Sequence, residues 1–156
     1  MAENGAIGRK NDLPWKLSGD LKHFSQVTAG KTVLMGLNTY KSILGVLGKP
    51  LPNRKNIILV FEKDPAIKEL QLTSLDEVLK LAEQEDIFVI GGASVYKQAL
   101  PHAKTLHLTR VHTKIDDADA FFPEVSSEEW KLINSESHKK DEKNQFEYTF
   151  EIYERK

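Results

Sequence analysis

Short apolar runs alternate with amphipathic stretches along the first two thirds of this chain. Three runs, at residues 32–35, 56–61 and 87–90, are almost unbroken in apolar residues and are bounded by polar ones. This is the pattern of short strands that are covered on both faces, as in a parallel sheet. The sequence therefore predicts three buried strands.

Helical signals lie between these runs. Ser74 is followed three residues later by Glu77, the spacing of a capping box, and apolar residues then recur at helical spacing. A second helix is predicted over residues 20–28, where Asp20 and Phe24 share one face. The first two thirds of the chain thus alternate strand and helix.

The last third changes character. Residues 105–111 form a β-rich run, and residues 130–133 and 146–153 read as two more strands. The polar stretch 135–145 between them predicts the loop of an antiparallel pair. We expect a single α/β domain over residues 1–156, with a mostly parallel central sheet, helices on both faces and an antiparallel C-terminal hairpin.

Composition narrows the class of protein. The chain has 156 residues, 22 basic against 23 acidic side chains, and no cysteine. Disulfides, thiolate nucleophiles and cysteine-ligated metals are therefore excluded. A formal net charge of −1 gives no general attraction to nucleic acid or to acidic membranes, and no apolar run approaches the ~20 residues that span a bilayer. We expect a cytoplasmic protein with neither nucleic acid nor membrane as partner.

Two strand–glycine–helix junctions carry candidate chemistry, at residues 33–39 and 89–96. Glycine allows close approach of a ligand, and the N-terminus of the following helix offers free N–H groups to an anion. Helices are predicted to begin near Asn38 and Ala93. The two junctions could hold the phosphates of a dinucleotide, or the glycines could serve only tight turns, since no full dinucleotide-binding glycine motif is present.

Two loops add candidate side chains. The polar loop at residues 8–19 carries Trp15 and leads into Asp20, on the first turn of a predicted helix. That carboxylate could lie in a pocket beneath a mobile lid, or could simply complement the helix dipole. The proline-rich loop at residues 48–54 ends at Arg54, which could clamp a carboxylate or lie as a solvated charge.

The order and spacing of these motifs extend over nearly the whole chain. They comprise Ile7, Gly8, residues 11–15, Asp20, Leu21, Phe24, Met35, Gly36, Thr39, residues 50–52 and 54–57, residues 90–92, Val95, Tyr96, Leu108, Thr109, Phe122, Pro123 and residues 150–152. Together they resemble the dihydrofolate reductase family. The resemblance implies hydride transfer from NADPH to 7,8-dihydrofolate, giving tetrahydrofolate for one-carbon metabolism and thymidylate synthesis. It also implies a monomer that binds antifolates such as methotrexate or trimethoprim.

The same resemblance implies the roles of individual residues. Asp20 would be the acid of the pterin pocket, Thr109 would hydrogen-bond it, Trp15 would hold an ordered water, and Leu13 would belong to the lid. The implied substrate-binding residues are Asp20, Phe24, Leu51, Arg54, Ile90 and Thr109. The implied cofactor-binding residues are Ile7, Gly36, Leu37, Asn38, Thr39, Gly91, Gly92, Ala93, Ser94, Val95 and Tyr96, with a cis peptide between the paired glycines. No metal ligand is implied.

Two departures from the family pattern give further expectations. The family normally opens with an apolar strand ahead of the stretch that matches residues 1–5, so we expect Met1 to be an internal methionine with a strand encoded upstream. The family also commonly carries arginine where this chain has Leu37, and a small hydroxyl residue near Phe61. Both usually contact the 2′-phosphate of NADPH, so we expect a weaker preference for NADPH than is typical, unless Lys41 or Lys63 substitutes.

Two other readings remain open at this stage. One is a related pyrimidine reductase of riboflavin synthesis. The predicted lid and the Arg54 clamp argue against this function. The other is a non-catalytic or impaired pterin- or nucleotide-binding remnant, made credible by Leu37 and the missing strand. The joint presence of Trp15, Asp20, Thr109 and Arg54 argues against such a loss of catalytic function.

Overall fold

A computed structural model describes residues 1–156, and its contacts divide the chain into two compact units. The terminal unit comprises Met1–Phe24 and Leu100–Lys156, and the central unit comprises Ser25–Ala99. The single-domain organisation expected from the sequence stays a prediction. None of the helices combines the length and apolar character needed to cross a membrane.

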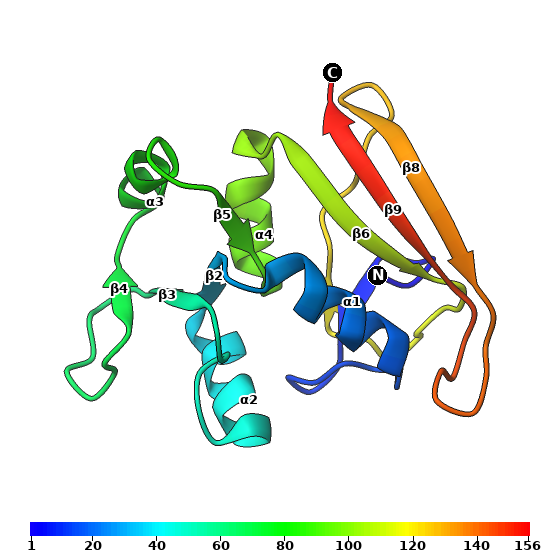
Figure 1. The fold of residues 1–156 in the computed structure, drawn as a ribbon, viewed down its shortest axis with the longest axis horizontal. Coiled ribbons are helices and arrows are strands. Elements are labelled where there is room, and N and C mark those ends of the chain that lie inside the picture. The colour runs from blue at the N-terminus through cyan, green and yellow to red at the C-terminus, as the bar shows by residue number, and fades with distance from the viewer. The chain divides into compact units, whose positions relative to one another are not determined.

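The central unit is built on a parallel sheet (Figure 1). Its strands are β2 (Thr32–Gly36), β3 (Lys55–Leu59), β4 (Leu70–Leu72) and β5 (Ile87–Val89), in the order β4-β3-β2-β5. The helices are α2 (Leu37–Leu47), α3 (Leu75–Ala82) and α4 (Ala93–Ala99). This confirms the α/β class and the three predicted strands, of which β2 and β3 are buried and β5 is half-buried.

Burial explains why these strands form. The side chains of Leu34 and Ile57 are fully buried and pack with Val78 of α3 and Val95 of α4 in one apolar cluster. At α3 the predicted capping box is present, because Ser74 accepts from the Glu77 N–H while the Glu77 carboxylate accepts from the Ser74 N–H. Both local signals read from the sequence are therefore confirmed.

The terminal unit is antiparallel. Strands β6 (Thr105–Val111), β8 (Trp130–His138) and β9 (Tyr148–Arg155) form a sheet in the order β6-β9-β8, and β1 (Ala6–Gly8) pairs with β7 (Ala120–Phe121). A short 3₁₀ turn, Leu100–His102, precedes β6. The strands of the chain are thus divided among three sheets rather than joined in one.

The hairpin prediction needs one correction. Residues 135–138 were predicted as loop but belong to β8, which runs to His138 beside β9 (Figure 1). Because β8 is the edge of its sheet, most of its side chains face solvent and it lacks an apolar pattern. Strands β1, β4 and β7 were not predicted, since runs of two or three residues show no period.

Helix α1 (Ser18–Thr28) begins two residues earlier than predicted. Its His23 ring stacks on Phe150 of β9, with the ring centroids 3.8 Å apart and the planes 13° from parallel. Trp15, Leu17, Val111 and Tyr148 are buried in the apolar cluster of this unit. The stretch that leads into α1 is therefore part of the core.

Candidate active site

In the terminal unit, an acid is paired with a hydroxyl. Asp20 lies in the first turn of α1, and Thr109 lies in β6. The hydroxyl of Thr109 donates a hydrogen bond of 2.7 Å to Oδ1 of Asp20, and both side chains are half-buried. The bond uses one carboxylate oxygen, so the second oxygen can take N–H donors from a ligand.

The first turn of α1 is positioned by residues of the β8–β9 loop. Oδ1 of Asn144 accepts the backbone N–H of Gly19 at 2.9 Å, and the Asn144 amide donates to Asp141 at 2.9 Å. Gly19 itself is required there, because an added Cβ would lie 2.1 Å from the hydroxyl oxygen of Tyr148. Neither Asn144 nor Tyr148 was identified from the sequence, since no local pattern links them to Asp20.

Trp15 supplies an unpaired donor beside this core. The side chain is only 8% exposed, and its indole Nε1 has no hydrogen-bond partner in the protein. A buried N–H costs free energy unless water or a ligand accepts from it. The family resemblance implies that an ordered water is the acceptor for Trp15.

The loop between β1 and α1 is tied at both ends. Oδ2 of Asp119 accepts the Lys10 N–H at 2.9 Å, and Arg9 forms an ion pair of 2.9 Å with Asp117, which holds the pKa of that carboxyl below its usual value. At the other end, the Lys16 N–H donates to the side chain of Gln145 at 3.2 Å. The loop is therefore anchored to two other segments of the terminal unit.

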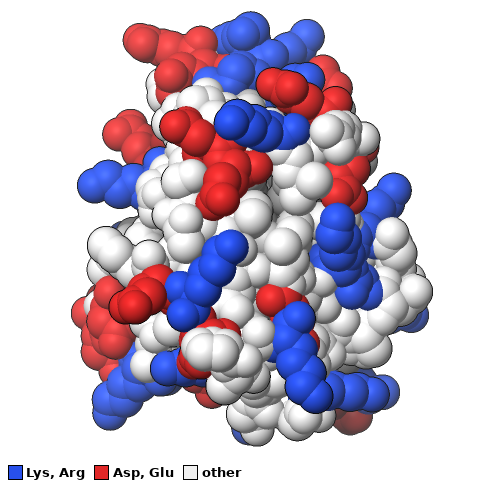
Figure 2. All heavy atoms as spheres, turned by 90° about the vertical axis from the view of Figure 1, so that its left-hand side faces the viewer, with Lys and Arg blue, Asp and Glu red and all other residues white.

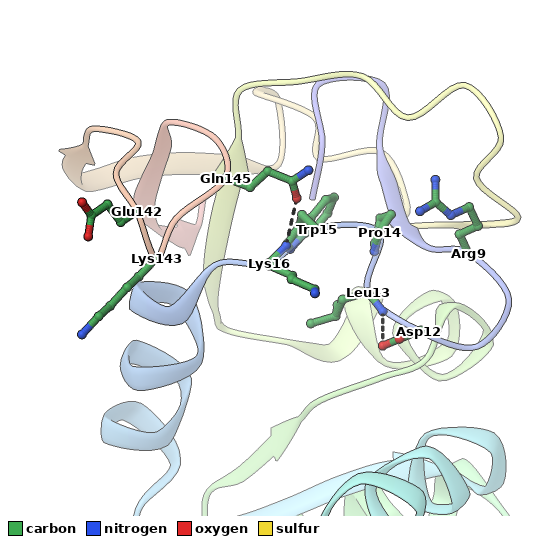
Figure 3. Close-up of a pocket in the computed structure, with 9 residues that line it drawn as sticks. All are labelled: Arg9, Asp12, Leu13, Pro14, Trp15, Lys16, Glu142, Lys143 and Gln145. Atoms are coloured by element: carbon green, nitrogen blue, oxygen red, sulfur yellow. Dashed lines mark hydrogen bonds between the residues drawn. The ribbon is translucent and has the colours of Figure 1, made fainter.

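An open cleft of about 620 Å³ lies along this loop (Figure 3). Leu13, at 47% exposure, lines it together with Pro14 and Trp15, and the β8–β9 loop closes it on the other side. Leu13 is thus an apolar side chain held in solvent on an anchored loop, a placement suited to covering a ligand.

Glycines in the central unit form a close-packed cradle. The Gly36 N–H donates to the Gly91 carbonyl at 2.9 Å, and the Gly91–Gly92 peptide is cis. A Cβ on either of the paired glycines would lie 3.4 Å from Oγ1 of Thr39, and one on Gly36 would lie 3.1 Å from Val95. Gly91 also has a φ of +130°, which side chains rarely adopt. Backbone can therefore approach a diphosphate closely here, so these residues fit a dinucleotide cofactor.

The proline-rich loop holds the guanidinium group of Arg54 in a defined place. Arg54 donates from Nε to the Pro52 carbonyl at 2.8 Å and from Nη1 to Oγ1 of Thr28 at 3.1 Å. The buried Asn56 side chain bonds both backbone groups of Leu51 and the carbonyl of Arg54. Thr28 and Asn56 position this loop, a role that sequence reasoning missed, although Asn56 lies within the matched stretch 54–57.

Comparison with known proteins decides the family. A sequence model described as dihydrofolate reductase matches residues 1–155. This chain belongs to the dihydrofolate reductase family. A dihydrofolate reductase of Bacillus subtilis is 42% identical over all of this chain and 91% of its own length, and one of Staphylococcus haemolyticus is 36% identical over 99% and 92%.

Solved structures of dihydrofolate reductases agree. One from Enterococcus faecalis, complexed with NADP(H) and RAB-propyl, aligns with a TM-score of 0.87 at 32% identity, over 99% of this chain and 92% of that one. The similarity extends over the full α/β arrangement and not only over the glycine junctions.

Within this dihydrofolate reductase fold, the predicted site residues are divided between the two units. The terminal unit holds Ile7, Leu13, Trp15, Asp20, Phe24 and Thr109. The central unit holds Gly36, Leu37, Asn38, Thr39, Leu51, Arg54, Ile90, Gly91, Gly92, Ala93, Ser94, Val95 and Tyr96. In the first set the structure joins Asp20 to Thr109, and in the second it gathers the glycines around Thr39.

Proposed function

We propose that this chain reduces 7,8-dihydrofolate to 5,6,7,8-tetrahydrofolate with NADPH, as its family membership indicates. The observation that carries the proposal is the half-buried carboxylate of Asp20, fixed by the Thr109 hydroxyl at 2.7 Å. When bound, NADPH supplies a hydride from C4 of its nicotinamide to C6 of the substrate. N5 of the substrate gains a proton from water, so the product carries one added hydride and one added proton.

Asp20 binds and polarises the pterin in this proposal. One carboxylate oxygen is held by Thr109 and the other accepts from the amino and ring N–H groups of the substrate. A carboxylate at that end of the ring favours the protonated form of N5, which makes C6 a better hydride acceptor. Phe24, one turn further along α1, packs on the rings.

Trp15 and the anchored loop exclude bulk water. The unpaired Nε1 of Trp15 binds a single ordered water, which links the indole to the pterin and to the acid. Leu13 would cover a bound nicotinamide, and so would help to keep bulk water from the site where the cofactor supplies its hydride.

Two features of the central unit bind the remaining groups. Gly36, Thr39 and the paired Gly91 and Gly92 hold the pyrophosphate of the cofactor, with Ser94 and Val95 beside it. Arg54, already oriented by Thr28 and Pro52, binds the glutamate carboxylate of the substrate, and Leu51 lines the benzoyl pocket.

We further propose a monomeric cytoplasmic enzyme, acting as one domain, that binds antifolates such as methotrexate or trimethoprim and neither nucleic acid nor membrane. The near-neutral net charge, and the interspersion of basic and acidic side chains across the face drawn in Figure 2, support the proposal that neither nucleic acid nor membrane is a partner.

The test is a paired assay of NADPH oxidation with dihydrofolate, on the wild type and on Asp20→Asn. Loss of a positioned acid–base group should lower kcat/KM by about 100-fold or more. Asp86→Asn is the matched control, because Asp86 is an exposed acid of the central unit. Turnover that survives Asp20→Asn undiminished would contradict the role given to the acid.

Two further measurements, methotrexate binding and assay with a pyrimidine substrate, distinguish the rival functions. Tight methotrexate binding without turnover would indicate a binding remnant. Reduction of a pyrimidine intermediate of riboflavin synthesis, with none of dihydrofolate, would indicate the related reductase.

A further inference from the structure

One corner of the central unit is formed where two neighbouring parallel strands end. Strands β2 and β3 are parallel neighbours, and Gly36 pairs with Leu59 at their carboxyl ends. The segments that follow therefore leave from neighbouring strand ends: Leu37 begins α2 directly after Gly36, and Phe61 and Glu62 follow Val60, whose N–H still donates to the Leu72 carbonyl of β4. We call Leu37, Phe61 and Glu62 the ribose corner.

The place of this corner follows from the general geometry of open α/β sheets. Where a glycine turn after one strand holds the pyrophosphate, the adenosine ribose lies near the carboxyl end of the adjacent strand. An acid at that end accepts a hydrogen bond from a ribose 2′-hydroxyl, whereas an arginine accommodates a 2′-phosphate. The residue type at this corner thus distinguishes the two nicotinamide cofactors.

The side chains of the ribose corner suit a hydroxyl better than a phosphate. Leu37 is apolar and half-buried, and the ring of Phe61 is fully exposed, at 106% relative accessibility. Glu62 is an exposed carboxylate, which accepts hydrogen bonds and repels a dianionic phosphate. None of the three residues can donate a charged hydrogen bond.

The basic residue closest in sequence, Lys63, lies within range of another carboxylate, that of Glu77. Lys63 acts on Glu77, whose pKa is lowered mainly by the Thr73 backbone N–H and further by the Lys63 charge. Lys41 lies one turn along α2 from Leu37, further from the sheet edge. Neither lysine belongs to the ribose corner.

From this arrangement we propose that the ribose corner accepts an unphosphorylated ribose, so that the enzyme uses NADH as well as NADPH and discriminates only weakly between them. The exposed Phe61 ring offers a surface on which the adenine can stack. The inference rests on the proposed function, because it concerns the same cofactor site.

Binding of two cofactor fragments tests the corner without turnover. Adenosine 5′-monophosphate and adenosine 2′,5′-bisphosphate differ only in the 2′-phosphate, and calorimetry gives their dissociation constants for the wild-type protein. We expect values within about tenfold of each other, less than one charged hydrogen bond would produce. Binding of the bisphosphate more than about 100-fold tighter would overturn the proposal. Loss of that preference in Lys41→Ala or Lys63→Ala would then identify the phosphate ligand.

Substitutions at the corner provide the reciprocal test. Leu37→Arg should tighten bisphosphate binding by about 10- to 100-fold and leave the monophosphate unchanged. Glu62→Gln should weaken turnover with NADH more than with NADPH, whereas Glu83→Gln, an exposed acid at the end of α3, should alter neither. If the ratio of turnover with NADH to turnover with NADPH is unchanged in Glu62→Gln, this result contradicts the role proposed for Glu62.

Steady-state kinetics with both cofactors distinguish a failure of the proposed function from a failure of the inference about the ribose corner. Turnover of dihydrofolate with neither cofactor would defeat the proposed function. Turnover with NADPH at a kcat/KM more than about 100 times that with NADH would defeat only the inference about the ribose corner.

Discussion

Asn144, in the β8–β9 loop, accepts the backbone N–H of Gly19 at 2.9 Å and so satisfies a free donor in the first turn of α1. A helix start is usually capped by its own preceding residue. Here the cap comes from a segment 125 residues away, and the next residue of the helix is Asp20. The placement of the acid therefore depends on a loop that is remote in sequence.

Asn144→Ala should accordingly affect both stability and substrate binding. Removing the side chain leaves the Gly19 N–H without its acceptor and takes one donor from Asp141, which keeps the Lys143 N–H, at a cost of about 1–3 kcal/mol in the free energy of unfolding. The KM for dihydrofolate should rise while the KM for NADPH stays constant. Denaturant titration and steady-state kinetics measure the two effects. Asn134→Ala, on the exposed edge strand β8, is the control and should change neither. A rise in both KM values would indicate general damage instead.

Thr109→Val tests the hydrogen bond to the acid directly. Valine keeps the shape and the β-branch of threonine but cannot donate, so Asp20 loses its 2.7 Å partner. We expect kcat/KM for dihydrofolate to fall about tenfold or more, since hydrogen bonds to charged groups are worth about 1.5–3 kcal/mol. Thr105→Val, at the exposed start of the same strand, should leave kcat/KM unchanged. An unaltered Thr109→Val enzyme would show that the hydroxyl does not position the acid.

Two glycine substitutions should change stability in opposite directions. In Gly19→Ala the new Cβ would lie 2.1 Å from the Tyr148 hydroxyl oxygen, and Tyr148 is buried, with its ring stacked on His138. We expect destabilisation by about 1–3 kcal/mol. Gly45→Ala, inside α2, meets no atom within 4 Å and should stabilise by about 0.5–1 kcal/mol. Chemical denaturation of both variants gives the comparison, and two changes of the same sign would contradict it.

What the sequence predicts correctly is local or periodic. The buried runs of β2 and β3 and the capping box of Ser74 and Glu77 lie within a few residues of one another, and all of them form. The polar residues 135–138 form a strand only because β9 pairs with them, so no local pattern could indicate it. The hydrogen bond between Thr109 and Asp20, which the family resemblance implies, is also present. The hydrogen bond between Asn144 and Gly19 could not be predicted, because it depends on where the backbone of a segment 125 residues away passes.

Alkaline stability should depend on Tyr40. This side chain is 6% exposed, and its hydroxyl donates to Oε2 of Glu69 at 2.5 Å. Burial, and then the bond to Glu69, raise the pKa of Tyr40 from 10.0 to about 12. The folded protein therefore holds this proton more tightly than the unfolded chain does. The resulting stabilisation is fully present below pH 10.0 and is lost as the pH rises toward about 12.

Tyr40→Phe removes the ionisable hydroxyl. The free energy of unfolding of the variant should therefore depend less on pH between 10.0 and about 12. The rise of the Tyr40 pKa from 10.0 to about 12 corresponds to roughly 1–3 kcal/mol, so the stability difference between wild type and variant should shrink by that amount across this pH range. Tyr96→Phe, a half-buried tyrosine of α4 in the same unit, serves as the comparison. Unfolding free energies at intervals of pH measure the effect. A constant difference between wild type and Tyr40→Phe would mean that the hydroxyl ionises alike in the folded and unfolded chains, and that its bond to Glu69 contributes no pH-dependent stability.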